Sequence, residues 1–438
     1  MSTRRTIRYA VLLSASVTVI AGLSTTAVVG QRGGVFRASR DHPAIEYSAG
    51  PVRNVVSELN QNILDGALRL EFNGRSGYLR SVLDALDIPI ESQVAVYSKT
   101  SRQADMITSD NPRVVFFNDT ASVGWVRDTD VLEVAAQDQQ QGVVFYTLSL
   151  TQAGTPQFTR DNQCLACHLS WDTLGVPGLQ VLSTAPLSAD PNAYATGFVS
   201  DHRSRLEDRW GGWYVTGSHG SVAHMGNVEV TDVEDPQMTF GVVPPELGSL
   251  EGKFNLDGYP SAHSDIVALL VLNHQAHMTN LITRVGWEAR RILYRNGGPS
   301  PDDSMFHEVI LDAAAELVDY LLFVDEAPLP TGIKGSSRFT ERFSSGGPHD
   351  SQGRSLKELD LARRLMRYPC SYMIYTPAFD ALPAIATDAI YARMWEILSG
   401  EAQADRYVRL SLADRQSIVD ILRDTKTNLP SYFQHVTR

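Results

Sequence analysis

The chain has 438 residues, of which 43% are hydrophobic, and its formal net charge is −12. This length suits two or three domains or one large elaborated domain, and the apolar content is enough for a sizeable core. The acidic balance argues against binding to nucleic acid or to anionic membrane surfaces, and it permits a basic protein partner.

The first 30 residues have the pattern of an export signal. Three arginines and no acidic residue precede an apolar run that ends near Leu23, and small residues such as Ala27 follow it. This order is typical of a secretory signal peptide. Serines and threonines interrupt the apolar run, which favours cleavage over an uncleaved span, with an N-terminal tether as the alternative. No later segment resembles a transmembrane helix, so we expect a periplasmic protein without firm membrane insertion.

The next part of the chain changes from helical to strand-like periodicity. Apolar spacing predicts helices over Val52–Leu70 and Leu79–Leu86. Short β-rich runs separated by turn residues then predict a small, mostly antiparallel sheet. These runs are Gln93–Tyr97, Val114–Phe117, Val123–Val126, Val131–Ala135 and Val143–Leu148.

The remainder is first rich in glycine, proline and aromatic residues and then mostly helical. Helices are predicted over Asp265 to about Tyr294, Met305–Val324, Ser355–Arg367, Ala384–Ser399 and Ser411–Thr425. The fold class is therefore α+β. We expect four parts, namely a signal peptide (1–30), a β-rich domain with short N-terminal helices (31–155), a middle region (156–263) and a helical region (264–438). The middle region contains a CxxCH sequence, which is typical of haem attachment, and is called the haem region.

The most informative motif is Cys164-Leu165-Ala166-Cys167-His168, a CxxCH sequence. This spacing is typical of c-type haem attachment, in which each thiol forms a thioether and the histidine binds iron from one side. A zinc site would need a second ligand pair, and Cys370 is the only other thiol in the chain. A thioredoxin-like redox pair would not need the histidine. We therefore predict one covalent haem c, with its iron bound by His168.

The second axial ligand of the iron is open at this stage. Met225 follows His168 by a spacing compatible with a distal methionine and lies in a glycine-rich loop with His224. Met225 is the first candidate and His224 the second. The remaining candidates are His219, His202, His263, His274 and His277. A vacant position is the further alternative, and it would favour ligand binding or peroxide chemistry.

The sequence also resembles a family of exported, single-CxxCH cytochrome c domain-containing proteins whose function is largely unassigned. The resemblance covers most of residues 51–430. It rests on the CxxCH motif and on strings that include Tyr97-Ser98-Lys99-Thr100-Ser101, Gly175-Val176-Pro177-Gly178, Arg209-Trp210-Gly211-Gly212-Trp213-Tyr214, His224-Met225-Gly226-Asn227 and Tyr368-Pro369-Cys370-Ser371-Tyr372. It implies a haem c, an extracytoplasmic location, and electron transfer or redox chemistry.

These observations favour an electron-transfer cytochrome c with a redox partner protein of basic character. Two other hypotheses stay open. One is an oxidoreductase that acts on a small oxidant such as peroxide, because a pure electron shuttle does not need about 400 residues. The other is a haem-based sensor or binding module.

Overall fold

A computed structural model describes residues 36–152, 154–184, 197–228, 243–296, 304–329 and 332–436. The predicted signal peptide lies outside these ranges. Within them, no helix is both long and apolar enough to cross a membrane.

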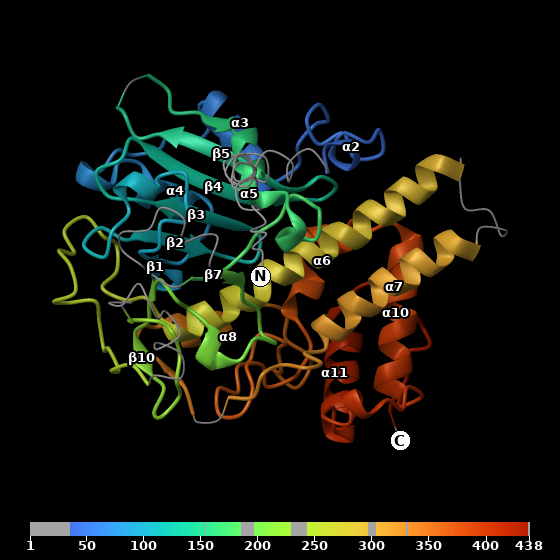
Figure 1. Ribbon diagram of the computed structural model, residues 1–438. Coiled ribbons are helices and arrows are strands. Elements are labelled where there is room, and N and C mark those ends of the chain that lie inside the picture. The colour runs from blue at the N-terminus through green and yellow to red at the C-terminus, as the bar shows by residue number, and fades with distance from the viewer. Residues whose placement is uncertain are drawn as a thin grey trace, which may run out of the picture.

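A seven-stranded antiparallel sheet forms one layer of the molecule (Figure 1). Its strand order is β6-β5-β4-β3-β2-β1-β9. The strands are β1 Val94–Val96, β2 Arg113–Phe117, β3 Ala121–Trp125, β4 Val131–Asp138, β5 Gly142–Ser149, β6 Phe158–Arg160 and β9 Trp213–Tyr214. The five strands predicted between residues 93 and 148 are confirmed as β1 to β5, and so is the antiparallel pairing.

The two faces of the sheet differ in how tightly they are covered. Along β4, Leu132, Val134 and Ala136 are buried, whereas the alternate residues Glu133 and Ala135 are only partly buried. Since successive side chains of a strand point to opposite faces, the buried set lies on one face and the partly buried set on the other. The first face packs on a core that includes α3 Val55–Leu64 and α4 Leu79–Ala85.

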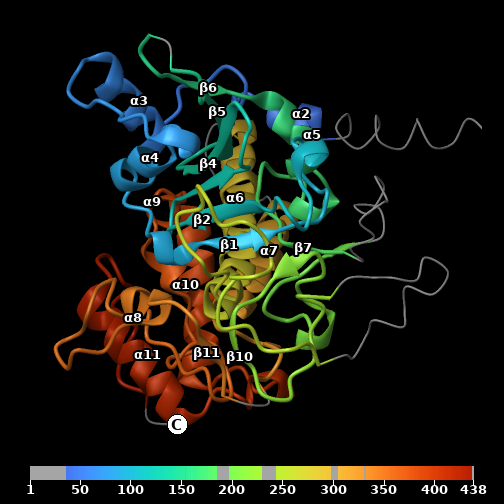
Figure 2. The ribbon, with the colours of Figure 1, turned by 90° about the vertical axis from the view of Figure 1, so that its left-hand side faces the viewer.

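A long central helix, α6 Ile266–Asn296, crosses the molecule and links the sheet to the C-terminal helices (Figures 1 and 2). It agrees with the predicted helix to within two residues at each end. Its residues from Ile266 to Ile282 are all buried, as expected for a helix surrounded by protein. The carboxylate of Asp265 accepts the N–H of Val267 at 2.8 Å and thereby caps the first turn.

The C-terminal part consists mainly of helices, most of which pack on α6 (Figure 2). They are α7 Ser304–Leu321, α8 Phe339–Ser344, α9 Pro377–Asp380, α10 Ala384–Ser399 and α11 Leu412–Thr425. The remaining short elements are α2 Arg37–Arg40, α5 Leu165–His168, β7 Leu182–Ser183, β8 Phe198–Val199, β10 Gly217–Ser218 and β11 Lys334–Gly335. Sheet and helices together give the α+β architecture that the sequence predicts.

The helix predicted over Ser355–Arg367 is wrong. This segment forms a hairpin-like turn in which the N–H of Arg367 donates to the carbonyl of Glu358 at 2.9 Å. Leu361 at its tip adopts a φ of 57°, which is incompatible with a continuing α-helix. Ion pairs such as Arg364 to Asp414, at 2.7 Å, hold the segment against α11 instead.

The middle of the chain is built into the sheet rather than set apart from it. β9, from the predicted haem region, pairs with β1 through Ala95 opposite Tyr214. This strand therefore brings residues 213–214 to the edge of the N-terminal sheet, next to α6.

Candidate functional site

The CxxCH segment leaves the sheet at its other edge, directly after β6. Asp161 accepts the N–H of Gln163 at 2.9 Å and starts a short 3₁₀ turn, Asn162–Cys164, which continues into α5. Leu165 is 4% exposed and anchors the turn in the core. Cys164 and Cys167 are free thiols, are half-buried, and line the same cavity.

His168 is held in a defined orientation by a pair of hydrogen bonds. Its Nδ1 lies 2.9 Å from the carbonyl oxygen of Gly178, and the N–H of Gly178 donates to the His168 carbonyl at 3.0 Å. Because a carbonyl can only accept, Nδ1 carries the proton and Nε2 keeps its lone pair. The imidazole also packs on Phe145 of β5, with 4.7 Å between the ring centroids.

Burial lowers the pKa of His168, against the opposing effect of its bond to Gly178. The charge of Arg113 lowers this pKa further, and that of Glu133 raises it. The side chain is therefore neutral at neutral pH, which is the form that binds metal ions. A donated Nδ1–H and a free Nε2 are what a histidine ligand of iron needs from its surroundings.

The cavity next to His168 lies between the sheet and α6. It contains about 1170 Å³ of empty space, a volume that includes space open to solvent. Strands β2 to β5 form one wall, and the opposite wall includes Leu272 and Ala276 of α6. Leu179 and Trp213 also line the cavity. Ser122, Gly124 and Ala135 have small side chains and therefore leave space above this part of the sheet.

Two arginines and one glutamate are the charged residues in the described lining of this cavity. Arg102 pairs with Asp161 and donates to Gln163 at 2.8 Å, next to Cys164. Arg113 of β2 donates from Nε and Nη2 to one carboxylate oxygen of Glu133, at 3.0 and 2.7 Å.

The donor set of the cavity fits a covalently bound haem c. Two thiols and one oriented, neutral imidazole come from a single short turn and line one cavity. The thiols themselves are not activated in the folded chain, because burial and the charge of Asp161 raise the pKa of Cys164 to about 11. Burial also raises the pKa of Cys167.

The structure does not bring Met225 to this cavity. The N–H of Met225 donates to the Arg209 carbonyl at 2.9 Å, and Ser183 Oγ lies 3.9 Å from its sulfur. The side chain is 4% exposed and does not line the cavity among the described residues. An axial role for Met225 would require its loop to leave these contacts.

His224 also lies away from the cavity. Its Nδ1 accepts the N–H of Gly226 at 3.1 Å, and its ring packs on His219 at 4.5 Å and on Trp210 at 5.3 Å. Burial and the neighbouring His219 lower its pKa to about 3. The loop that carries Met225 and His224 is therefore packed against other residues of the middle region, away from the cavity.

Other polar residues of the middle region meet α6 in a separate, partly buried cluster. His202 Nδ1 lies 2.8 Å from His274 Nδ1, and Arg203 Nη2 lies 3.1 Å from His277 Nε2. Arg203 also pairs with Asp201 at 2.6 Å. Among the described residues, no group of three or more histidine, cysteine, aspartate or glutamate side chains is arranged to hold a metal ion.

No local sequence pattern indicates the arginines that line the cavity. Arg113 and Glu133 lie on strands separated by β3 and meet only through strand pairing. Gly178 likewise becomes a partner of His168 only when the chain folds back after α5. The strict alternation along β4 was the one sequence feature that could have pointed to Glu133.

No protein-family model, no curated protein and no solved structure matches this chain.

Proposed function

We propose that the protein is an exported monohaem c-type cytochrome that transfers one electron at a time. The observation that carries the proposal is the convergence of Cys164, Cys167 and the oriented imidazole of His168 on one cavity. A haem bound there would supply an iron that cycles between two oxidation states. The chain's own residues would hold this group, orient its histidine ligand and limit its contact with water.

Each of these tasks falls to identifiable side chains. The Gly178 carbonyl keeps the His168 proton on Nδ1 and leaves Nε2 for the iron. Phe145, Leu179 and Leu272 supply the apolar surroundings. A low-dielectric pocket of this kind disfavours the more highly charged state of a redox group and so favours reduction.

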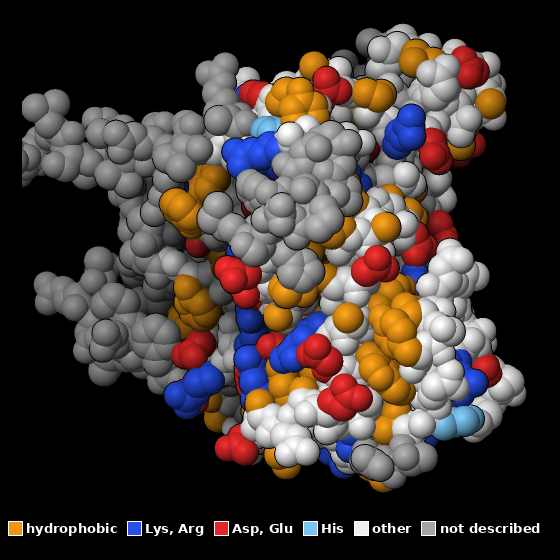
Figure 3. All heavy atoms as spheres, turned by 90° about the vertical axis from the view of Figure 1, so that its right-hand side faces the viewer, with side chains coloured by type: hydrophobic (Ala, Val, Ile, Leu, Met, Phe, Trp, Pro, Cys, Tyr) orange, Lys and Arg blue, Asp and Glu red, His pale blue; other side chains and the backbone are white. Residues whose placement is uncertain are grey.

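The mouth of the cavity suits electron exchange with another protein. Arg102, with 47% of its side chain exposed, lies there beside the exposed residues Gln163 and Ala166. Acidic, basic and apolar side chains are interspersed on the molecular face seen in Figure 3. A basic redox partner is supported by the net charge of −12 rather than by one acidic patch on that face.

Two further proposals concern the location of the protein and the stage at which haem is attached. The protein resembles the exported single-CxxCH family, and its N-terminal pattern supports a periplasmic location, with a cleaved leader or an N-terminal tether. Because both thiols have raised pKa values in the folded chain, thioether formation is expected before folding is complete.

The test is covalent attachment. Haem should remain on the polypeptide through denaturation and acid-acetone extraction, and a Cys164→Ala, Cys167→Ala variant should be colourless. Cys370→Ala is the matched control. This thiol is fully buried elsewhere, so its substitution should leave haem content unchanged. Haem that is extracted freely from the wild type would contradict the proposal.

A further inference from the structure

The cavity also contains a polar feature that is separate from the two thiols and His168. Arg113 and Glu133 form an ion pair on the sheet wall, with 23% and 20% of their side chains exposed. Both hydrogen bonds of this pair use Arg113 Nε and Nη2 and the single acceptor Glu133 Oε2. Among the described residues, Arg113 Nη1 has no hydrogen-bond partner, so it is available to a ligand.

The strand between the two residues leaves room for this arrangement. Gly124 of β3 lies opposite Val115 of β2 and Glu133 of β4 in the strand register. A Cβ at Gly124 would lie 2.2 Å from Arg113 Nη2, so any side chain there would displace the guanidinium. The glycine thus leaves room for the guanidinium, which is the end of a flexible side chain and lies over β3.

The charges of Arg113 and Glu133 both act on the pKa of His168. Both residues line the same cavity as His168. Among the described lining residues, His168 is the only imidazole and no methionine is present. Once the two thiols are used in attachment, the described part of the cavity offers a fixed cation but neither a second imidazole nor a thioether as a ligand for iron.

We propose that Arg113 is the binding residue of a small-anion site in this cavity, held in place by Glu133 and given room by Gly124. The ligand class is a small anion such as azide, fluoride or the anion of a peroxide. Arg113 would donate a charge-assisted hydrogen bond from Nη1 to the anion. This inference rests on the proposed haem attachment, and it favours ligand binding over a purely six-coordinate electron carrier.

The experiment is a spectroscopic titration of the ferric holoprotein with azide and with fluoride. We expect both to bind, and we expect Arg113→Ala to weaken binding at least about tenfold, because a hydrogen bond from a charged donor is lost. Arg113→Lys should retain part of the affinity. Gly124→Ala should weaken binding by displacing Arg113, although it removes no charge.

The matched control is Arg284→Ala. Arg284 pairs with Glu316 at 2.6 Å, is partly exposed, and does not line the cavity. Its loss should leave anion affinity unchanged, and circular dichroism will show whether each variant is folded.

Three results would overturn the inference. A holoprotein with covalent haem that binds neither anion would leave the proposed function standing and remove the anion site. Loss of haem content in Arg113→Ala with unchanged anion affinity would assign Arg113 to the haem carboxylates instead. Absence of covalent haem from the wild type would contradict the proposed function itself, and the anion site with it.

Discussion

The Nδ1–H of His168 donates to the carbonyl of Gly178 at 2.9 Å, and the N–H of Gly178 donates back to the carbonyl of His168 at 3.0 Å. This reciprocal pair joins the end of the CxxCH turn to the segment ten residues later. It fixes both the tautomer and the orientation of the ring before any metal is bound. Gly178 is itself packed against α6, since a Cβ there would lie 2.2 Å from Asn280 Oδ1.

Gly178→Ala should therefore disturb the histidine through its carbonyl partner. Asn280 cannot easily yield, because its amide bonds both the N–H and the carbonyl of Leu179, at 2.8 and 2.7 Å. Overpacking of this kind costs about 1–3 kcal/mol of unfolding free energy. We expect a lower urea midpoint and a shifted reduction potential. Gly248→Ala is the control, because a Cβ at Gly248 meets no atom within 4 Å. Equal stability and potential in the two variants would contradict this role of Gly178.

The features that could be predicted from the sequence depend on residues that are close together in the chain. The CxxCH motif is one turn long, β4 shows a strict alternation, and α10 begins and ends where its periodicity does. The features that could not be predicted depend on residues far apart. The strand register brings Arg113 to Glu133, and tertiary ion pairs override the helical spacing of residues 355–367. Spacing along the chain suggested Met225 as a ligand, but spacing says nothing about the contacts that hold it elsewhere.

Met225→Ala should affect stability rather than iron ligation. Truncation of a buried methionine leaves a cavity and typically costs about 2–5 kcal/mol. Since the sulfur lies beside Ser183 and not in the cavity of His168, we expect the visible spectrum of the ferric protein to stay unchanged. Loss of a far-red charge-transfer band in this variant would instead identify Met225 as the second axial ligand.

The buried histidines of α6 should make the free energy of unfolding sensitive to acid. Burial, and to a smaller extent the charge of Arg203, lowers the pKa of His277 to about 4, against the opposing effect of Asp201. Between about pH 6.5 and 4 the unfolded chain then binds a proton that the folded chain does not. The unfolding free energy should fall as pH decreases through this window, by at most about 3 kcal/mol from His277, and the loss should level off below it.

His277→Gln should flatten this dependence, because glutamine does not titrate and can still accept from Arg203. Urea unfolding at a series of pH values measures the slope. His349→Gln, at an exposed position, is the control and should leave the slope unchanged. An identical slope in His277→Gln and wild type would show that His277 titrates alike in both states.

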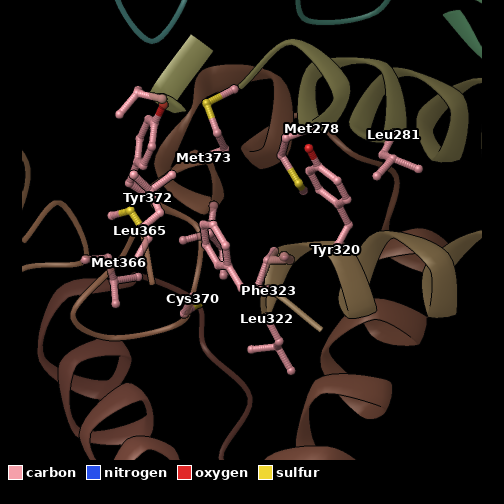
Figure 4. Close-up of a cluster of buried hydrophobic side chains, with 14 of the residues drawn as sticks. Met278, Leu281, Tyr320, Leu322, Phe323, Leu365, Met366, Cys370, Tyr372 and Met373 are labelled. Atoms are coloured by element: carbon pink, nitrogen blue, oxygen red, sulfur yellow. The ribbon is translucent and has the colours of Figure 1, made fainter. Parts of the chain in front are cut away.

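Thiol counting provides the last test, because the three cysteines lie in two different environments. Cys370 is 0% exposed within the cluster that includes Tyr320, Phe323 and Tyr372 (Figure 4), and burial raises the pKa of its thiol. A thiol that is neither accessible nor ionised does not react with thiol reagents. With Cys164 and Cys167 in thioethers, the native holoprotein should show no reactive thiol and the urea-unfolded holoprotein one. Three reactive thiols after unfolding would mean that haem is not covalently bound, whereas one reactive thiol in the native state would mean that the core around Cys370 opens.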